Sequence, residues 1–132
     1  MIDIQATFPV MVAKNLDKLE QFYTGVFGFE AVFFEPGFYL HLVASGTGSQ
    51  LGFMCANHES QPAFLHPEMC ADGYVISFEV SDATKAYAEA KKLELPVVMA
   101  IKDEAWGQRH FILEDPAGFK VDIVEHLQSP TN

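Results

Sequence analysis

One order of secondary-structure elements occurs twice along the chain, and this repeat constrains the fold more than any other feature. Each half reads as a strand, a helix and three further strands. The two predicted helix caps, Asn15 and Asp82, lie 67 residues apart, close to half of the chain. The predicted strands cover Ile4–Ala13, Phe29–Glu35, Phe38–Ala44, Gln50–Cys55, Gly73–Val80, Val97–Ile101 and a final hairpin. The sequence therefore predicts an α+β fold, in which two βαβββ modules form a curled mixed sheet around a cleft.

Both predicted helices have start signals and an apolar stripe at helical spacing. Asn15 and Asp82 are residue types that cap helix N-termini, and Gly28 is placed to end the first helix. The apolar residues that follow the two caps are Leu16, Leu19, Phe22, Tyr23, Val26 and Phe27, then Ala83, Ala86, Tyr87, Ala90 and Leu93. This spacing predicts two amphipathic helices, each covering one sheet face.

The last strands form the clearest local signal. Two alternating runs flank Asp115-Pro116-Ala117-Gly118, in which proline fixes one backbone angle and glycine supplies a positive φ. The pattern predicts a β-hairpin with Gln108–Glu114 paired to Phe119–Glu125.

The organisation expected from these elements is one domain over residues 1–132. The first module covers about residues 1–56 and the second about residues 73–127. Between them, residues 57–72 carry two prolines and two histidines and read as a linker, with a ligand-contacting lid as the alternative.

Charge and composition exclude several function classes. The net charge of −10 disfavours nucleic acid and anionic membranes as partners and favours a cationic ligand. No apolar run is long enough to span a bilayer, and the N-terminus lacks the pattern of a signal peptide. Two cysteines, Cys55 and Cys70, make no disulfide framework, so we expect a cytoplasmic protein.

Several stretches resemble one known superfamily. Residues 9–34 (PVMVAKNLDKLEQFYTGVFGFEAVFF), residues 74–90 and the combination of Trp106-Gly107-x-Arg109 with Asp115-Pro116-x-Gly118 are similar to the vicinal-oxygen-chelate superfamily. That superfamily includes glyoxalase I, extradiol dioxygenases and bleomycin-resistance proteins, and the resemblance is to the bleomycin-resistance-like branch. It covers nearly the whole chain and implies the two-module fold and a homodimer.

The resemblance also identifies where a metal would bind in the metalloenzymes of the superfamily. Those four positions are occupied here by Phe8, Gly52, Val75 and Asp122, of which only Asp122 has a side chain that coordinates metals. A single carboxylate does not hold a metal against water, so we predict no metal, no cofactor and no catalytic residues.

The favoured function is therefore binding of a small molecule without chemistry. Flat apolar walls and carboxylates suit an aromatic ligand with a cationic group, such as an antibiotic that the protein sequesters. The predicted ligand-binding residues are those at the former metal positions and their neighbours, together with aromatic residues of loops and of the middle strand: Trp106, Phe8, Phe53, Asp122, Phe38, His41, Phe64 and Val75.

Other interpretations stay open. One is a metal-dependent lyase, isomerase or dioxygenase with a relocated site made of His41, His110 and Asp122. Another is a regulatory or protein-binding module whose cleft is filled by its own phenylalanines. Arg109 is expected to pair with a local carboxylate such as Glu114 or Asp115, or to bind an anion.

The four side chains Cys55, His58, His66 and Cys70 have the spacing of a zinc site, but no zinc-knuckle pattern lies between the two pairs. We therefore interpret this spacing as coincidence.

Overall fold

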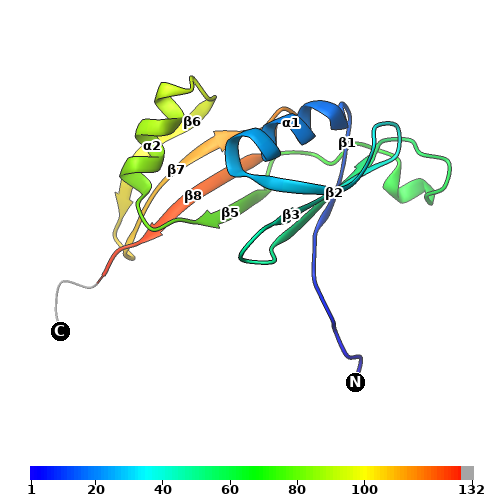
Figure 1. Cartoon of the computed structure of the whole chain (residues 1–132), viewed down its shortest axis with the longest axis horizontal. Coiled ribbons are helices and arrows are strands. Elements are labelled where there is room, and N and C mark those ends of the chain that lie inside the picture. Colours follow the sequence, from blue (N-terminus) through cyan, green and yellow to red (C-terminus); the bar gives the residue numbers. More distant parts are fainter. Residues whose placement is uncertain (129–132) are drawn as a thin grey trace. The chain divides into compact units, whose positions relative to one another are not determined.

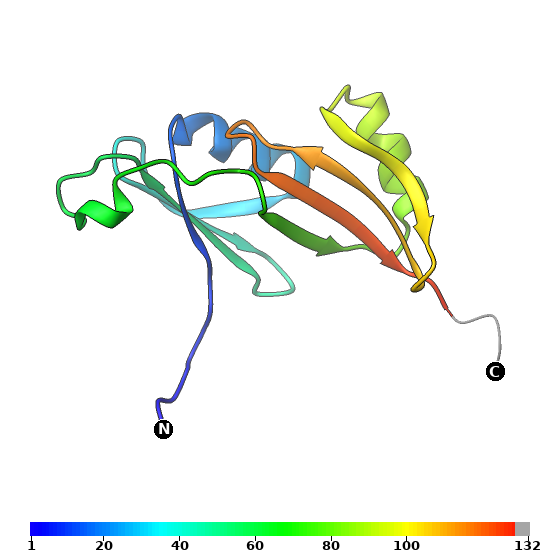
Figure 2. The same ribbon diagram turned by 180° about the vertical axis from the view of Figure 1, so that it is seen from behind.

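The computed structural model describes residues 1–128, which divide into two units that meet at Cys70 and Ala71. Each unit contains one helix and one four-stranded mixed sheet, drawn from front and back in Figures 1 and 2. The predicted α+β fold of two βαβββ modules is confirmed. No helix among residues 1–128 is long and apolar enough to cross a membrane.

Unit 1 places its strands in the order β1-β4-β3-β2, with β1 parallel to β4 and the other pairs antiparallel. Its elements are β1 (Val10–Ala13), α1 (Leu16–Phe27), β2 (Phe29–Glu35), β3 (Tyr39–Ala44) and β4 (Gln50–Cys55). A 3₁₀ turn, η1 (Ala63–Leu65), lies in the segment predicted as a linker.

Unit 2 repeats this topology in the order β5-β8-β7-β6, with β5 parallel to β8. Its elements are β5 (Val75–Glu79), α2 (Ala83–Lys92), β6 (Val97–Glu104), β7 (Gln108–Glu114) and β8 (Lys120–His126). The predicted C-terminal hairpin is confirmed, with its second strand shifted by one residue.

The helix of each unit covers one face of its own sheet. In unit 1, α1 buries Leu16, Leu19 and Tyr23 against strands that contribute Leu40 and Phe53. Side chains alternate along a strand, so the neighbours of Leu40 point away from the helix. We call the sheet face opposite the helix the distal face. In unit 2 the helix side of β7 holds the buried Phe111 and Leu113, which leaves His110 on the distal face.

The first strand is shorter than predicted. The expected Ile4–Ala13 pairs only over Val10–Ala13, and residues 1–9 are exposed and form no strand. Val10 pairs with Gly52 in parallel register, so Phe8 is level with Gln50, where β4 begins, and residues 1–7 lie beyond that end. Pro9 has no backbone N–H to donate, although its carbonyl accepts from the Gly52 N–H at 2.9 Å. The predicted strand is therefore wrong over residues 4–9, because strand-forming residues also need a neighbouring strand with which to pair.

Both predicted helix caps stand at the helix N-termini, but only one of them makes a side-chain hydrogen bond. The Asp82 carboxylate accepts a hydrogen bond from the Lys85 backbone N–H at 2.9 Å, as predicted. Asn15 makes no side-chain cap bond and adopts a left-handed conformation, φ 55° and ψ 53°. Its role is to turn the chain from β1 into α1, a conformation that asparagine tolerates better than most residues. Gly28 ends α1 as expected, with φ 72°.

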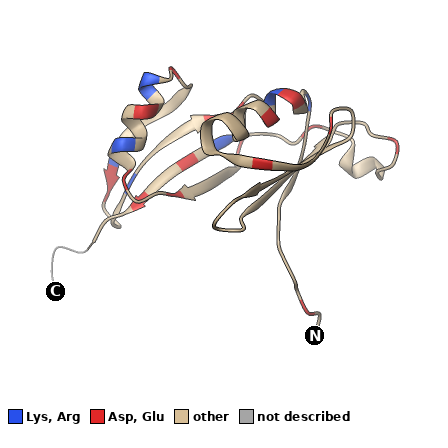
Figure 3. Cartoon of the chain, in the orientation of Figure 1, with Lys and Arg blue, Asp and Glu red and all other residues tan. Residues whose placement is uncertain are grey.

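Lysines gather on α2, which carries Lys85, Lys91 and Lys92, whereas acidic residues are spread over both units (Figure 3). Because α2 covers the other side of its sheet, these positive charges lie away from the distal face of unit 2.

Candidate functional site

The distal face of unit 1 carries a group of aromatic rings in mutual contact. We call the six residues involved the aromatic cluster: Phe8, Phe33, Phe38, Tyr39, His41 and His58. The ring centroids of Phe8 and His41 are 4.6 Å apart in an edge-on contact, and Tyr39 stacks on His41 at 5.7 Å. Phe8 and Phe33 are nearly half exposed. The cluster is therefore a partly open aromatic surface of the kind that stacks on flat ligands.

Strand register explains why these rings meet. Tyr39 and His41 alternate with the buried Leu40 along β3, and Phe33 on β2 lies directly opposite His41. A bulge separates Ala31 from Phe33 and leaves Val32 exposed. Because the bulge inserts an extra residue, it sets the phase in which Phe33 shares the face of His41.

A hydrogen-bond chain crosses the aromatic cluster. The Tyr39 hydroxyl lies 2.7 Å from His41 Nδ1, and His41 Nε2 lies 2.7 Å from Gln50 Oε1. This hydrogen-bond chain lies beside Gly52. A Cβ added at Gly52 would overlap the Tyr39 hydroxyl and would stand 3.0 Å from the Cζ atom of Tyr39. Glycine is required here because the tyrosine occupies the space of a side chain.

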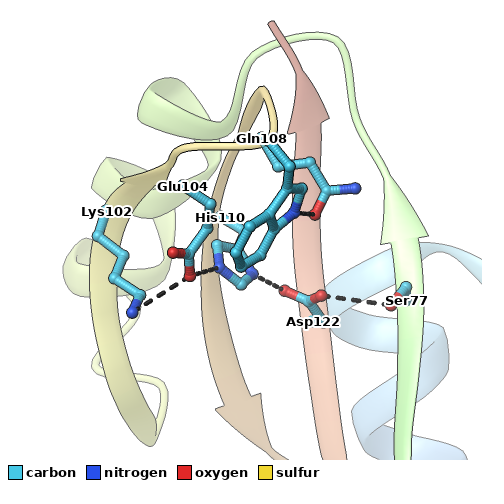
Figure 4. Close-up of polar contacts among 7 residues, drawn as sticks. Ser77, Lys102, Glu104, Gln108, His110 and Asp122 are labelled. Atoms are coloured by element: carbon cyan, nitrogen blue, oxygen red, sulfur yellow. Dashed lines mark hydrogen bonds and ion pairs between the residues drawn. The ribbon is translucent and has the colours of Figure 1, made fainter.

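The distal face of unit 2 is polar instead. His110 lies between two carboxylates, with Nδ1 2.8 Å from Asp122 Oδ1 and Nε2 2.8 Å from Glu104 Oε2 (Figure 4). The hydroxyl of Ser77 donates to the other Asp122 oxygen at 3.3 Å, and Lys102 Nζ lies 3.2 Å from Glu104. The side chains of His110, Asp122 and Glu104 are all less than one fifth exposed. We call these five residues the carboxylate–histidine cluster.

The cluster shifts the pKa values of its members. Burial lowers the pKa of His110, but the hydrogen bonds to Glu104 and Asp122 outweigh it and raise this pKa above its ordinary value. The hydrogen bond from His110 is the main reason why the pKa of Glu104 is lowered. Both shifts favour an imidazolium that donates from each nitrogen to a carboxylate.

We expect stability to depend on pH through His110. Because its folded-state pKa is raised, the contribution is fully present below the unfolded pKa of about 6.5 and is lost as pH rises through the folded value. The contribution of Glu104, whose pKa is lowered, is lost instead as pH falls through that lowered value. Urea unfolding across about pH 5 to 9 checks this, because His110→Gln should flatten the alkaline decline.

His126→Gln is the matched control. His126 also contacts a glutamate, Glu79, but that pair is mostly exposed, so its removal should leave the pH profile unchanged. Parallel profiles for wild type and His110→Gln would contradict the assigned role of His110.

Trp106 stands at one end of the carboxylate–histidine cluster. It is 70% exposed, and its indole Nε1–H donates to Gln108 Oε1 at 2.9 Å. Gln108 pairs in register with Glu104 and lies two residues before His110, on the same face of the sheet. The hydrogen bond links the exposed indole ring to the side chain of Gln108.

The structure divides the predicted ligand-binding residues between the two units. Unit 1 brings Phe8, Phe38 and His41 into the aromatic cluster, and unit 2 holds Val75, Trp106 and Asp122. Val75 is half exposed, two residues before Ser77 on the same face of β5.

Two predicted residues lie apart from these groups. Phe53 is fully buried in the core of unit 1, with its ring 5.5 Å from that of Tyr23. Phe64 is largely exposed within the 3₁₀ turn.

Several site residues were missed at the sequence level: Tyr39, Phe33, His58, Ser77, Glu104 and Gln108. The alternation of Tyr39 with His41 was a usable signal for one of them. Glu104 could not be found, because β6 was predicted to end at Ile101 and extends to Glu104.

Arg109 has a different partner from those predicted. Its guanidinium forms two hydrogen bonds with Asp103, at 2.7 and 3.0 Å, in place of Glu114 or Asp115. The reason is the extra length of β6, which places Asp103 opposite Arg109 in the antiparallel register.

The two distal faces use equivalent positions differently. Val10 pairs with Gly52 in unit 1 and Ser77 pairs with Asp122 in unit 2, and Val10 and Ser77 are 67 residues apart, as are the helix starts. Gly52 and Asp122 are therefore equivalent. The tyrosine hydroxyl covers the first position, and His110 and Ser77 bond to the second.

The residues at the four metal positions implied by the family resemblance do not fit a metal. Phe8 and Val75 offer no donor, Gly52 lies beneath Tyr39, and both oxygens of Asp122 already take part in hydrogen bonds. Within residues 1–128, no three or more His, Cys, Asp or Glu side chains are grouped so that they could hold a metal ion.

Comparisons with known proteins agree with the fold. The model of the Glyoxalase/Bleomycin resistance protein/Dioxygenase superfamily matches residues 6–123. No curated protein matches the sequence significantly.

Solved structures with the same fold include proteins of different description. A lactoylglutathione lyase from Agrobacterium tumefaciens is 25% identical, with a TM-score of 0.72 over 92% of this chain and 94% of that one. A superfamily member from Sphaerobacter thermophilus is 22% identical, with a TM-score of 0.74 over 96% of this chain and 100% of that one. TioX from Micromonospora sp. ML1 is 16% identical, with a TM-score of 0.74 over 93% and 99%.

Proposed function

We propose, from the premise that the chain belongs to the Glyoxalase/Bleomycin resistance protein/Dioxygenase superfamily, that it binds a small aromatic molecule and does not convert it. The molecule carries positive charge and is of a kind that includes antibiotics. By binding it, the protein sequesters it. The observation that carries this proposal is the aromatic cluster of unit 1, in which six rings contact one another on one sheet face.

The aromatic cluster supports an aromatic ligand through its geometry. Rings in fixed orientations offer large apolar area, and little conformational entropy is lost when a flat molecule stacks on them. Phe8 and Phe33 are nearly half exposed, so burying them under a ligand would add hydrophobic stabilisation.

Charge supports a cationic ligand. The net charge is −10, and three of the eight basic residues lie on α2, away from the distal face of unit 2. An exposed indole, that of Trp106, lies on unit 2. Carboxylates and indole faces both attract cations.

A metal-dependent enzyme is the second candidate, favoured by the similarity to a lactoylglutathione lyase and by the adjacent His110 and Asp122. Its relocated site would also need His41, whose two nitrogens bond to Tyr39 and Gln50. Elemental mass spectrometry after incubation with divalent ions and dialysis separates the candidates. Stoichiometric retention of one ion, abolished by Asp122→Ala, would replace the binding proposal with the enzyme.

Calorimetric titration with matched planar probes tests the proposal directly. We expect 1-methylquinolinium, a planar cation, to bind more tightly than quinoline-4-carboxylate, a planar anion, because the protein is acidic. Phe33→Ala should weaken the binding of the cation by about tenfold, since an aromatic contact contributes about 0.5–1.5 kcal/mol beyond the effect of its buried area.

Val32→Ala is the control for Phe33→Ala. Val32 is the adjacent residue at the bulge and is similarly exposed, but it contributes no ring. Phe64→Ala in the same titration tests whether the 57–72 segment acts as a lid. Absence of binding by every planar probe would overturn the proposal.

A homodimer located in the cytoplasm completes the proposal. Both features follow from the family resemblance and the reduced cysteines, and sedimentation velocity measures the first of them.

A further inference from the structure

We infer that the Tyr39 hydroxyl oxygen accepts a hydrogen bond from the ligand that the aromatic cluster binds, so that the ligand is an aromatic molecule bearing an N–H or O–H donor. This inference rests on the proposed function and specifies the chemistry of the ligand. It is carried by the direction of the hydrogen bonds that run through Tyr39, His41 and Gln50.

The direction of the hydrogen bonds that run through Tyr39, His41 and Gln50 is set at the Gln50 end. The Oε1 atom of Gln50 only accepts, so the nitrogen that faces it, His41 Nε2, must carry the proton and donate. In a neutral imidazole the other nitrogen, Nδ1, then presents a lone pair. The Tyr39 hydroxyl lies 2.7 Å from that nitrogen and is therefore the donor in this contact.

The Tyr39 oxygen consequently uses its only proton inside the protein. Two lone pairs remain, and within residues 1–128 the one hydrogen bond of this oxygen is the one that it donates to His41. Successive hydrogen bonds in one direction polarise each other, which makes the last oxygen a better acceptor. Burial also raises the pKa of Tyr39, which keeps the phenol neutral and its proton on the chain to His41.

Tyr39 belongs to the aromatic cluster on the distal face of unit 1. Its ring contacts Phe33, Phe38 and His41, and its hydroxyl lies over Gly52, where a side chain would displace it. Tyr39 is only partly buried. An aromatic ligand stacked on the neighbouring rings would meet this acceptor. A ligand with a donor group would therefore bind more tightly than an ether or an unsubstituted ring, which cannot donate.

A pair of probes that differ in one donor tests the inference. 2-Naphthol carries an O–H group, and 2-methoxynaphthalene has the same rings without the donor. Calorimetric titration gives the ratio of their dissociation constants in the wild type and in Tyr39→Phe. We expect the preference for 2-naphthol to fall by about fivefold to tenfold in Tyr39→Phe, the effect of one hydrogen bond, while the affinity for the ether changes little.

Two further variants make the result specific. Tyr87→Phe removes the hydroxyl of a half-buried tyrosine on α2 of unit 2 and should leave the ratio unchanged. Gln50→Leu keeps Tyr39 but removes the acceptor that fixes the His41 tautomer, so the preference should fall in part. If Tyr39 had a purely structural role, Tyr39→Phe would weaken the binding of both probes equally, and the ratio of their dissociation constants would stay unchanged.

The outcomes separate this inference from the proposed function. If both probes bind and their ratio is the same in the wild type and in Tyr39→Phe, the acceptor role is wrong and aromatic binding stands. If neither probe nor 1-methylquinolinium binds, the proposed function fails and this inference fails with it.

Discussion

Asp115→Ala should lower the free energy of unfolding by about 2–4 kcal/mol, because it leaves one buried and one partly buried backbone donor without an acceptor. Asp115 is 5% exposed, and its Oδ1 accepts from the backbone N–H groups of Ala117 and Phe119 at 2.8 and 3.0 Å. These bonds hold the turn between β7 and β8, the two central strands of the unit 2 sheet. Urea unfolding measures the loss.

Two comparisons isolate the cause. Asp115→Asn retains an acceptor oxygen at the same place and should be less damaging than alanine. Asp103→Ala removes a carboxylate from an exposed pair with Arg109 and should change stability little. Equal losses for Asp115→Ala and Asp103→Ala would show that the turn bonds are not responsible.

Gly52→Ala should destabilise unit 1 by about 1–3 kcal/mol and weaken aromatic binding, because overpacking displaces a side chain. The added Cβ would overlap the Tyr39 hydroxyl, so the ring must rotate away and lose its bond to His41. Urea unfolding and titration with 1-methylquinolinium measure the two effects.

A double-mutant cycle assigns the loss to Tyr39. In a Tyr39→Ala background the space above residue 52 is free, so Gly52→Ala should cost much less than in the wild type. Additive costs would mean that the glycine is needed for a reason other than contact with Tyr39. Gly25→Ala is a control, since an added Cβ there meets nothing within 4 Å.

Much of the fold could be predicted because local signals and tertiary pairing agree. The helix that ends at Gly28 and the strands Phe29–Glu35 and Gln50–Cys55 have their predicted limits. The prediction failed where pairing decides alone. Residues 4–7 lie beyond the start of β4 and form no strand, whereas Lys102–Glu104 joins β6 because β7 offers partners.

The site was harder to predict because it depends on contacts between strands. That Asp122 is a key position followed from the family resemblance, but its partners Ser77 and His110 lie on two other strands. Whether Tyr39 reaches over Gly52 depends on the register of β3 against β4, which a side-chain pattern does not encode. The alternation of side chains along a strand shows which residues share a sheet face, but the register between strands decides which of them are in contact.

The placement of one fluorophore and two thiols allows the separation of the two units to be followed. Trp106 is the only tryptophan of the chain and belongs to unit 2, whereas both thiols, Cys55 and Cys70, belong to unit 1. Cys70 is exposed, so after Cys55→Ser it can be labelled with an acceptor dye. Energy transfer from the indole to the dye then reports in real time whether the distance between Trp106 and residue 70 changes when a ligand is added.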